Sequence, residues 1–568
     1  MKLAPEMRSW CAHAQTQKAA FGRFVSGLFC LTLLGGCMSP EEAVEEADAE
    51  VYALVQERRD AVVGDELPFS IQPPEGSLRQ QLLRGEGLDD ERIGNLKFDQ
   101  CLEIAAENSR SFQSQKETLY LAALDLTLER WRFGTIFSLG GSTGASGSGF
   151  DDGTVSTDVD GSASRLFGNG GQLVTNIGAS LFRAIGTGDG WDALSNLGVS
   201  FTQPLMRGSA REIVMEPLTQ AERDLVYAVR NFERFRSGFA YDVASRYYSL
   251  LLTMQTVKNE LDNVDMLELL SRRNRAFAEA GQLNEIQAGQ ADQEVLRSRN
   301  RLVELEGRLE RELDSFKLFL GLPIDTPVKL NDEGLSMLEI EEASSLLHGW
   351  QEDQLIEFAL KRRFDFLNTL EQLIDAERRT RIAADQLRMG LGLSTSISGS
   401  SSEGRPLGYS DDRLPWSVEL DLDLPVDQIP ERNSYRRSLI TYEARRRSME
   451  ELAESIRVDL RDSIRSTQTT EASYRLQLET VALNQKRVKS ATMKLEAGRA
   501  ETRELLESQR DLLSALNSAD AALVEFTLAK LELYRQLELV EFDPSGIVVH
   551  MEELAPGPAN NNRNSENE

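Results

Sequence analysis

Residues 416–425 read WSVELDLDLP, and this stretch decides the fold class. From Trp416 to Leu424 every even position is apolar, and every odd position is polar. A period of two residues is typical of a β-strand with one apolar and one polar face. The strand ends at Pro425, which has no N–H for the strand ladder. The acids of the polar face are Glu419, Asp421 and Asp423.

The chain on both sides of this strand has a helical pattern. Residues 353–387 are expected to be helical and to lead into a β-hairpin at 388–424. A long helix is then expected over about 432–495, and Gly498 breaks it before a partner helix over 501–539. The predicted unit is therefore helix, β-hairpin, long helix and shorter helix.

The same order of elements occurs earlier in the chain. Ala280-Gly281 corresponds to Ala497-Gly498 at an offset of 217, and Asp99-Gln100 corresponds to Asp353-Gln354 at an offset of 254. Pro204 ends a strand as Pro425 does, at an offset of 221. We therefore expect a two-fold internal repeat in which the first hairpin region is the longer one.

The repeat sets the expected domain limits along the chain. They are a lipoprotein signal peptide at 1–36, an acidic tether at 37–97, a first repeat at 98–322 with its hairpin region at 133–203, a connector at 323–352, a second repeat at 353–540 with its hairpin at 388–424, and a tail at 541–568 with a disordered end. Within the first hairpin region, Val155–Leu166 and Leu173–Leu181 are additional strand candidates. Their pattern leaves open whether they enlarge the sheet or extend beyond it.

The N-terminus has the layout of a secretory signal, with a basic beginning and the apolar run Val25–Leu34. Ten apolar residues are too few to span a membrane as a helix, which needs about 20. The ending Leu-Gly-Gly-Cys at 34–37 resembles a bacterial lipobox, which implies cleavage before Cys37 and acylation of its thiol. Met38 in place of aspartate favours sorting to the outer membrane. An ordinary signal peptide cleaved nearby is the alternative.

Composition excludes several classes of protein. A net charge of −29 argues against nucleic acid as a partner, since phosphate binding needs basic patches. Three distant histidines argue against a metal site or a histidine-based triad. The stretch Gly140–Gly144 fits the pattern G-x-S-x-G, but it lies in a Gly/Ser-rich hairpin region instead of a strand–turn–helix elbow. We expect no enzyme activity, no metal and no cofactor.

One chain cannot complete the predicted architecture. The apolar stripes of its helices are narrow, which suits lateral packing of helices side by side. Its four predicted strands are too few to close a membrane barrel, for which about eight is the minimum. Both deficits are met if several copies each contribute a sector.

At this point the chain resembles the TolC-like outer-membrane efflux family, in its lipoprotein branch. The resemblance covers about 98–540 and rests on the repeat, the Ala-Gly helix breaks, and Gln-Pro-Leu-Met-Arg-Gly at 203–208. It implies a mainly α fold with a membrane β part, in which long antiparallel helical hairpins form a periplasmic α-barrel. A homotrimer with four strands per protomer would form the outer-membrane β-barrel. Such a duct is passive, and a periplasmic adaptor and an inner-membrane pump serve it.

The resemblance also assigns roles to residues. The two helix breaks imply an adaptor-docking tip formed by Gln282, Leu283, Asn284, Arg499, Ala500 and Thr502. Glu504 and Glu507, three residues apart on one helix face, imply an acidic pore constriction that attracts cations. Glu419, Asp421 and Asp423 would face the barrel lumen. The family's Tyr and Arg gate positions hold Leu495 and Ala500 here, so that latch is absent or rebuilt from Arg499 or Arg503.

Two other classes stay open at this stage. A structural coiled-coil lipoprotein of the envelope would share the helices but would not need the alternation from Trp416 to Leu424. A periplasmic adaptor would need a lipoyl-like β domain between its helices. The sequence indicates neither the transported solute nor the class of pump.

Overall fold

The computed structural model describes residues 38–62, 64, 68–72, 78–84, 94–148, 153–185, 191–331, 334–335, 338, 350–402, 408–409, 414–497, 499–543 and 546–550. The predicted signal peptide, Cys37 and the predicted disordered end of the tail lie outside these residues. The described parts of the chain form two compact units. Unit 1 comprises Met1–Phe69, Leu119–Val229 and Glu371–Arg446, and unit 2 comprises Ser70–Thr118, Arg230–Leu370 and Arg447–Glu568.

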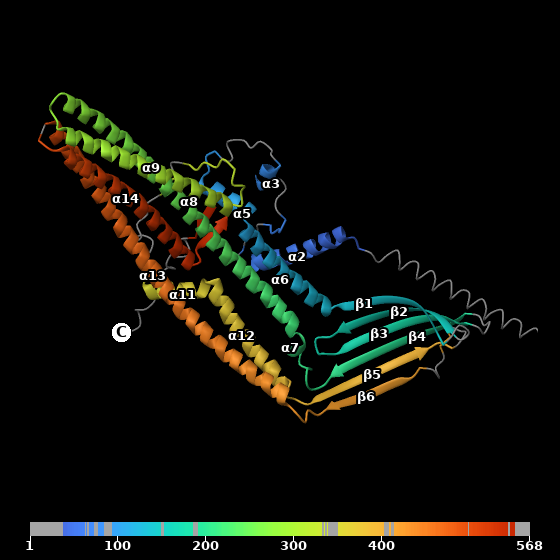
Figure 1. The fold of residues 1–568 in the computed structure, drawn as a ribbon. Helices are drawn as coiled ribbons and strands as arrows, with labels where there is room; N and C mark the ends of the chain where they lie inside the picture. The colour runs from blue at the N-terminus through green and yellow to red at the C-terminus, as the bar shows by residue number, and fades with distance from the viewer. Residues whose placement is uncertain are drawn as a thin grey trace, which may run out of the picture. The chain divides into compact units, whose positions relative to one another are not determined.

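Helices make up most of the described chain (Figure 1). They are α2 (Pro40–Val62), α3 (Leu78–Leu83), α5 (Phe98–Asn108), α6 (Arg110–Arg132), α7 (Arg211–Val214), α8 (Glu216–Glu279), α9 (Glu285–Phe319), α11 (Glu352–Arg362), α12 (Phe364–Asp385), α13 (Ile429–Glu496) and α14 (Thr502–Gln536). The predicted long helices are thus present, with 64 residues in α8 and 68 in α13.

The two predicted leading helices are each broken once, and the breaks correspond. Ser109 separates α5 from α6, and Arg363 separates α11 from α12, at the offset of 254 seen in the sequence. Each break residue leaves the helical conformation, while its N–H still donates to the carbonyl four residues earlier. The helix starts correspond too, because Gln100 and Gln354 each accept a hydrogen bond from the backbone N–H three residues before.

Unit 1 contains one six-stranded antiparallel sheet in the order β1-β2-β3-β4-β5-β6 (Figure 1). The strands are β1 (Thr135–Gly147), β2 (Gly153–Leu166), β3 (Gln172–Ile185), β4 (Asp192–Pro204), β5 (Gly390–Ser400) and β6 (Trp416–Asp423). The expectation of four strands per chain is therefore wrong. The region 133–203 forms two hairpins instead of one, because the alternation in the additional candidates continues the two faces of the sheet.

Unit 2 is built by helix packing. One buried cluster joins α11, α13 and the end of α14 through residues such as Leu355, Leu460 and Leu533. A second cluster joins α8, α9, α13 and α14 through Leu267, Leu270, Val295, Ala491, Leu505 and Leu506. The narrow apolar stripes predicted from the sequence therefore meet as two helical hairpins, α8 with α9 and α13 with α14.

The segment after α14 is more ordered than the predicted tail. β7 (Val540–Asp543) and β8 (Gly546–Val549) form a short antiparallel hairpin. The His550 N–H closes it by donating to the Leu539 carbonyl at 3.0 Å. The predicted disorder concerned the region from Pro556 onward, outside the described residues.

Candidate functional site

The six-stranded sheet has two chemically different faces. Residues paired directly across antiparallel strands lie on the same face, so the register assigns every strand position. One face carries exposed large apolar side chains on five of the strands. They are Phe137, Leu139, Ile177, Leu197, Val199, Ile397, Trp416, Val418, Leu420 and Leu422. Exposed fractions reach 77% at Phe137 and 73% at Trp416, which is the reverse of a soluble sheet.

The opposite face is mainly serine, threonine, asparagine, glycine and acid. The predicted lumen residues Glu419, Asp421 and Asp423 lie together on it, opposite Ser394, Gly392 and Gly390 of β5. The register adds acids that sequence reasoning did not single out, and these are Asp158, Asp160 and Asp192. Among the described residues of these strands, the polar face carries no lysine or arginine. Its charge is therefore of one sign and suits cations.

The motif at 203–208 joins the sheet to the helices of unit 1. The Leu205 N–H donates to the Leu391 carbonyl at 2.7 Å, and the Arg207 guanidinium lies 2.6 Å from the Asp423 carboxylate. The Gly208 N–H donates to Asp385 at 2.8 Å, and Gly208 has a positive φ of 74°. The motif thus fixes β4 against β5, β6 and the end of α12, a role that its sequence did not reveal.

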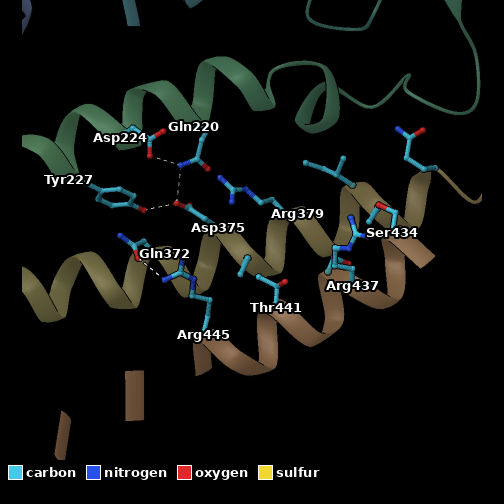
Figure 2. A pocket seen from close by; sticks show the side chains of 15 residues that line it. Gln220, Asp224, Tyr227, Gln372, Asp375, Arg379, Ser434, Arg437, Thr441 and Arg445 are labelled. Carbon is cyan, nitrogen blue, oxygen red and sulfur yellow. Dashed lines mark hydrogen bonds between the residues drawn. The ribbon is translucent and has the colours of Figure 1, made fainter. Parts of the chain in front are cut away.

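A groove of about 590 Å³ lies between α8, α12 and α13 within unit 1 (Figure 2). On one wall Tyr227 donates to the Asp375 carboxylate at 2.7 Å, and Arg223 lies 2.5 Å from the same group. Burial raises the pKa of the Tyr227 hydroxyl, and its hydrogen bond to Asp375 raises it further. This buried network holds α8 against α12, the helices that follow β4 and precede β5.

The two helix breaks predicted to form the tip have matching backbone turns in unit 2. The Gln282 N–H donates to the Phe277 carbonyl and the Arg499 N–H donates to the Lys494 carbonyl, both at 2.8 Å. Gly281 permits the first turn with a φ of 69°. Asn284 also caps α9, since its side chain accepts from the Ile286 N–H.

Five of the six predicted tip residues are at least partly exposed. Gln282, Asn284 and Arg499 are exposed, while Leu283 and Ala500 are half-buried. The prediction that Thr502 is exposed is wrong, because its exposed fraction is 0%. Its hydroxyl accepts a hydrogen bond at 3.1 Å from the amide of Asn274, which is also buried, so Thr502 joins the two helical hairpins.

The predicted constriction residues Glu504 and Glu507 are both exposed in the first turns of α14. The Lys494 ammonium lies 3.4 Å from Glu504, which lowers the net negative charge there. Leu495, the residue that the resemblance aligned with a tyrosine gate position, packs partly buried against the cluster of Leu505 and Leu506. This position therefore makes an apolar contact.

One described helix, α14, is long and apolar enough to cross a membrane by length and composition alone. Of its most apolar 18-residue stretch, 28% is buried, and Leu505, Leu506 and Leu533 of this helix belong to the buried clusters of unit 2. Within the described ranges no group of histidine, cysteine or acidic side chains has the arrangement of a metal site.

Comparison with known proteins identifies the kind of fold. Residues 355–538 match the family model described as "Outer membrane efflux protein". The search of curated proteins finds no match. The predicted resemblance to TolC-like outer-membrane efflux proteins is confirmed by this match together with the fold.

Solved structures match most of the chain at low sequence identity. The outer-membrane channel OprN matches with a TM-score of 0.58 and 16% identity over 83% of this chain and 94% of that one. VceC from Vibrio cholerae matches with a TM-score of 0.57 and 13% identity over 79% of this chain and 97% of that one. The MtrE outer-membrane channel of Neisseria gonorrhoeae matches with a TM-score of 0.56 and 13% identity over 78% of this chain and 88% of that one. The chain therefore has the fold of these outer-membrane proteins.

The Thr502–Asn274 hydrogen bond should stabilise the junction of the two turns. Thr502→Val keeps the shape of the side chain but leaves the buried Asn274 amide without its acceptor, at a cost of about 1–3 kcal/mol. Hydrogen exchange should accelerate at residues 277–284 and 497–502. Thr502→Ser, which keeps the hydroxyl, is the control, and equal exchange in the two variants would contradict the assignment.

Proposed function

We propose that this chain is the outer-membrane channel of a tripartite efflux or type I secretion system, and that it exports solutes passively. The observation that carries the proposal is the two-faced sheet. Its exposed apolar face suits lipid, and its acidic polar face suits a water-filled lumen. The alternative of a structural coiled-coil lipoprotein does not explain why the sheet has one exposed apolar face and one acidic face.

The free edges of the sheet support an oligomer. Within the described residues, β1 and β6 each pair on one side only. Unpaired backbone groups are not tolerated in hydrocarbon, and six strands are fewer than the eight of the smallest membrane barrels. The resemblance to the TolC-like family suggests three copies around one lumen, with β1 of each copy paired to β6 of the next.

The N-terminal anchor is part of the proposal. Leu-Gly-Gly-Cys at 34–37 supports acylation of Cys37, which would tether the chain to the outer membrane. Cys37→Ala should abolish incorporation of labelled palmitate. Equal labelling of variant and wild type would count against the anchor alone, since the channel does not require it.

The sheet can be tested by charge placement. Leu420 lies on the apolar face and is 63% exposed, and arginine in a lipid-facing strand costs about 2–4 kcal/mol at the bilayer centre. Leu420→Arg should therefore prevent accumulation of the assembled oligomer in the outer membrane, measured by fractionation and native gels. Asp421→Asn, on the opposite face of the same strand, should assemble normally. Equal behaviour of the two variants would contradict the assignment of faces.

Docking of an adaptor is proposed at the two turns, through Gln282, Leu283, Asn284, Arg499 and Ala500. A photo-crosslinking residue at position 282 or 499 should capture a periplasmic adaptor in cells. The same residue at Phe137, on the apolar face of the sheet, is the control. Adducts from Phe137 alone would refute this docking surface.

Glu504 and Glu507 are proposed to form acidic rings at the constriction. In planar bilayers, the double variant Glu504→Gln/Glu507→Gln should lose cation preference and resist block by trivalent cations. Lys494→Gln provides a control of opposite sign, since removing the ammonium near Glu504 should strengthen cation preference. Unchanged selectivity in the double variant would exclude the rings and leave the channel itself intact.

A further inference from the structure

We propose that the β2–β3 hairpin is part of the membrane wall, so that the assembled channel has eighteen strands and admits solutes too large for a twelve-stranded lumen. Three copies of a six-stranded sheet give eighteen strands. This inference rests on the proposed channel function and adds its width and the class of solute, namely bulky and neutral or cationic.

The hairpin is paired with its neighbours on both sides along most of its length. β2 pairs with β1 from Arg165 opposite Thr135 to Gly153 opposite Gly147. β3 pairs with β4 from Gln172 opposite Thr202 to Phe182 opposite Asp192. An appendage beyond the membrane would pair only with itself, whereas both outer edges of this hairpin are occupied by its neighbours.

The hairpin also keeps the two faces of the sheet in phase. One transverse row on the apolar face runs through Leu139, Gly161, Ile177, Leu197 and Gly399. Ile177 is 61% exposed there, close to the 59% of Leu139 and the 44% of Leu197. A one-residue slip would move every side chain to the other face, so this agreement indicates one continuous wall.

On the polar face, reciprocal contacts fix the seam between β3 and β4. Asn176 lies opposite Gly198, and Asn196 lies opposite Gly178. A Cβ on Gly198 would lie 2.8 Å from the Asn176 amide, and a Cβ on Gly178 would collide with Asn196. Each asparagine thus occupies the space that its partner glycine leaves, which specifies β3 as the neighbour of β4.

The hairpin's turn beside the helices is tight and adds no helix to unit 1. Gly170 has a φ of 80°, and a Cβ there would lie 2.7 Å from the Pro204 ring and 2.9 Å from the Gly208 carbonyl. Gln203 of β4 donates to the Asn169 carbonyl at 2.8 Å. The turn therefore packs against the β4–α7 junction. The hairpin adds two strands to the sheet and no helix to unit 1.

The polarity of the hairpin suits this place. Asp158 and Asp160 lie on the polar face with Glu419 and Asp421, so the hairpin adds negative charge to the lumen. Its two arginines, Arg165 and Arg183, lie on the apolar face near opposite ends of the hairpin. Long basic side chains at such positions can reach the headgroup level of a bilayer.

The number of strands sets the width of the lumen. Strands about 4.8 Å apart and tilted by about 40° give a perimeter of about 75 Å for twelve strands and about 113 Å for eighteen. Opposite strand backbones are then about 36 Å apart for eighteen strands and about 24 Å apart for twelve.

The first test locates the hairpin relative to lipid. Spin labels are attached to Ile177→Cys and Asn176→Cys, in a chain whose buried Cys101 is replaced by alanine. Reconstituted in bilayers, the label at 177 should be relaxed by oxygen and not by a water-soluble nickel complex, and the label at 176 should show the reverse. Leu420→Cys and Asp421→Cys provide the same pair on β6.

The outcomes separate the two proposals. If the label at Ile177→Cys is exposed to water while the label at Leu420→Cys is exposed to lipid, the eighteen-stranded wall is wrong and the proposed channel function is unaffected. Water access at both 177 and 420 would overturn the channel function itself.

The second test measures width from the outer side, independently of the constriction. Deleting residues 149–190 joins β1 to β4 and keeps the faces in phase, since Thr135 and Phe201 lie on the same face. Maleimide-polymers of graded length are applied to cells carrying Thr202→Cys, on the polar face of β4. The longest reagents that modify the full chain should fail with the deletion variant. The same cutoff in both, or a smaller one in the full chain, would overturn the widened lumen.

Discussion

The two edge strands of the sheet, β1 and β6, limit how this chain can be placed in a membrane. In hydrocarbon each unpaired backbone group costs several kcal/mol, so a membrane sheet must close. The sheet described here ends in two edges, β1 and β6. In the proposed assembly, closure by further copies would place the exposed apolar side chains of one face against lipid and the acids of the other face in water.

The helices also carry apolar side chains that the single chain buries only in part. Their apolar residues meet in clusters such as Leu267, Leu505 and Leu506, which join two helical hairpins within one chain. Many large apolar side chains outside these clusters are exposed, among them Leu296, Val303 and Leu476. In the proposed assembly, lateral packing of copies would cover them.

The sequence predicted the elements whose pattern is strong and local. Alternation from Trp416 to Leu424 placed Glu419 and Asp421 on one face, and the offset of 254 located both helix starts. The breaks at Ser109 and Arg363 were missed because neither residue is a glycine or a proline. The strand number was wrong because periodicity gives the faces of β2 and β3 but not their neighbours. That choice depends on contacts between distant residues, such as Asn176 with Gly198.

The candidate site was predictable where it depends on local sequence patterns and not where it depends on contacts between distant residues. The turn positions followed from the Ala-Gly breaks, but the burial of Thr502 depends on Asn274, 228 residues away. The joining role of Arg207 and Asp385 likewise arises only when four elements meet.

Electron cryomicroscopy of the full-length protein in lipid nanodiscs would show how the strand edges are paired in a bilayer. We expect a three-fold assembly in which β1 of each copy is hydrogen-bonded to β6 of the next, with Glu419 and Asp421 facing an open lumen. A single copy with both strand edges free, or a closed wall with these acids facing lipid, would contradict it.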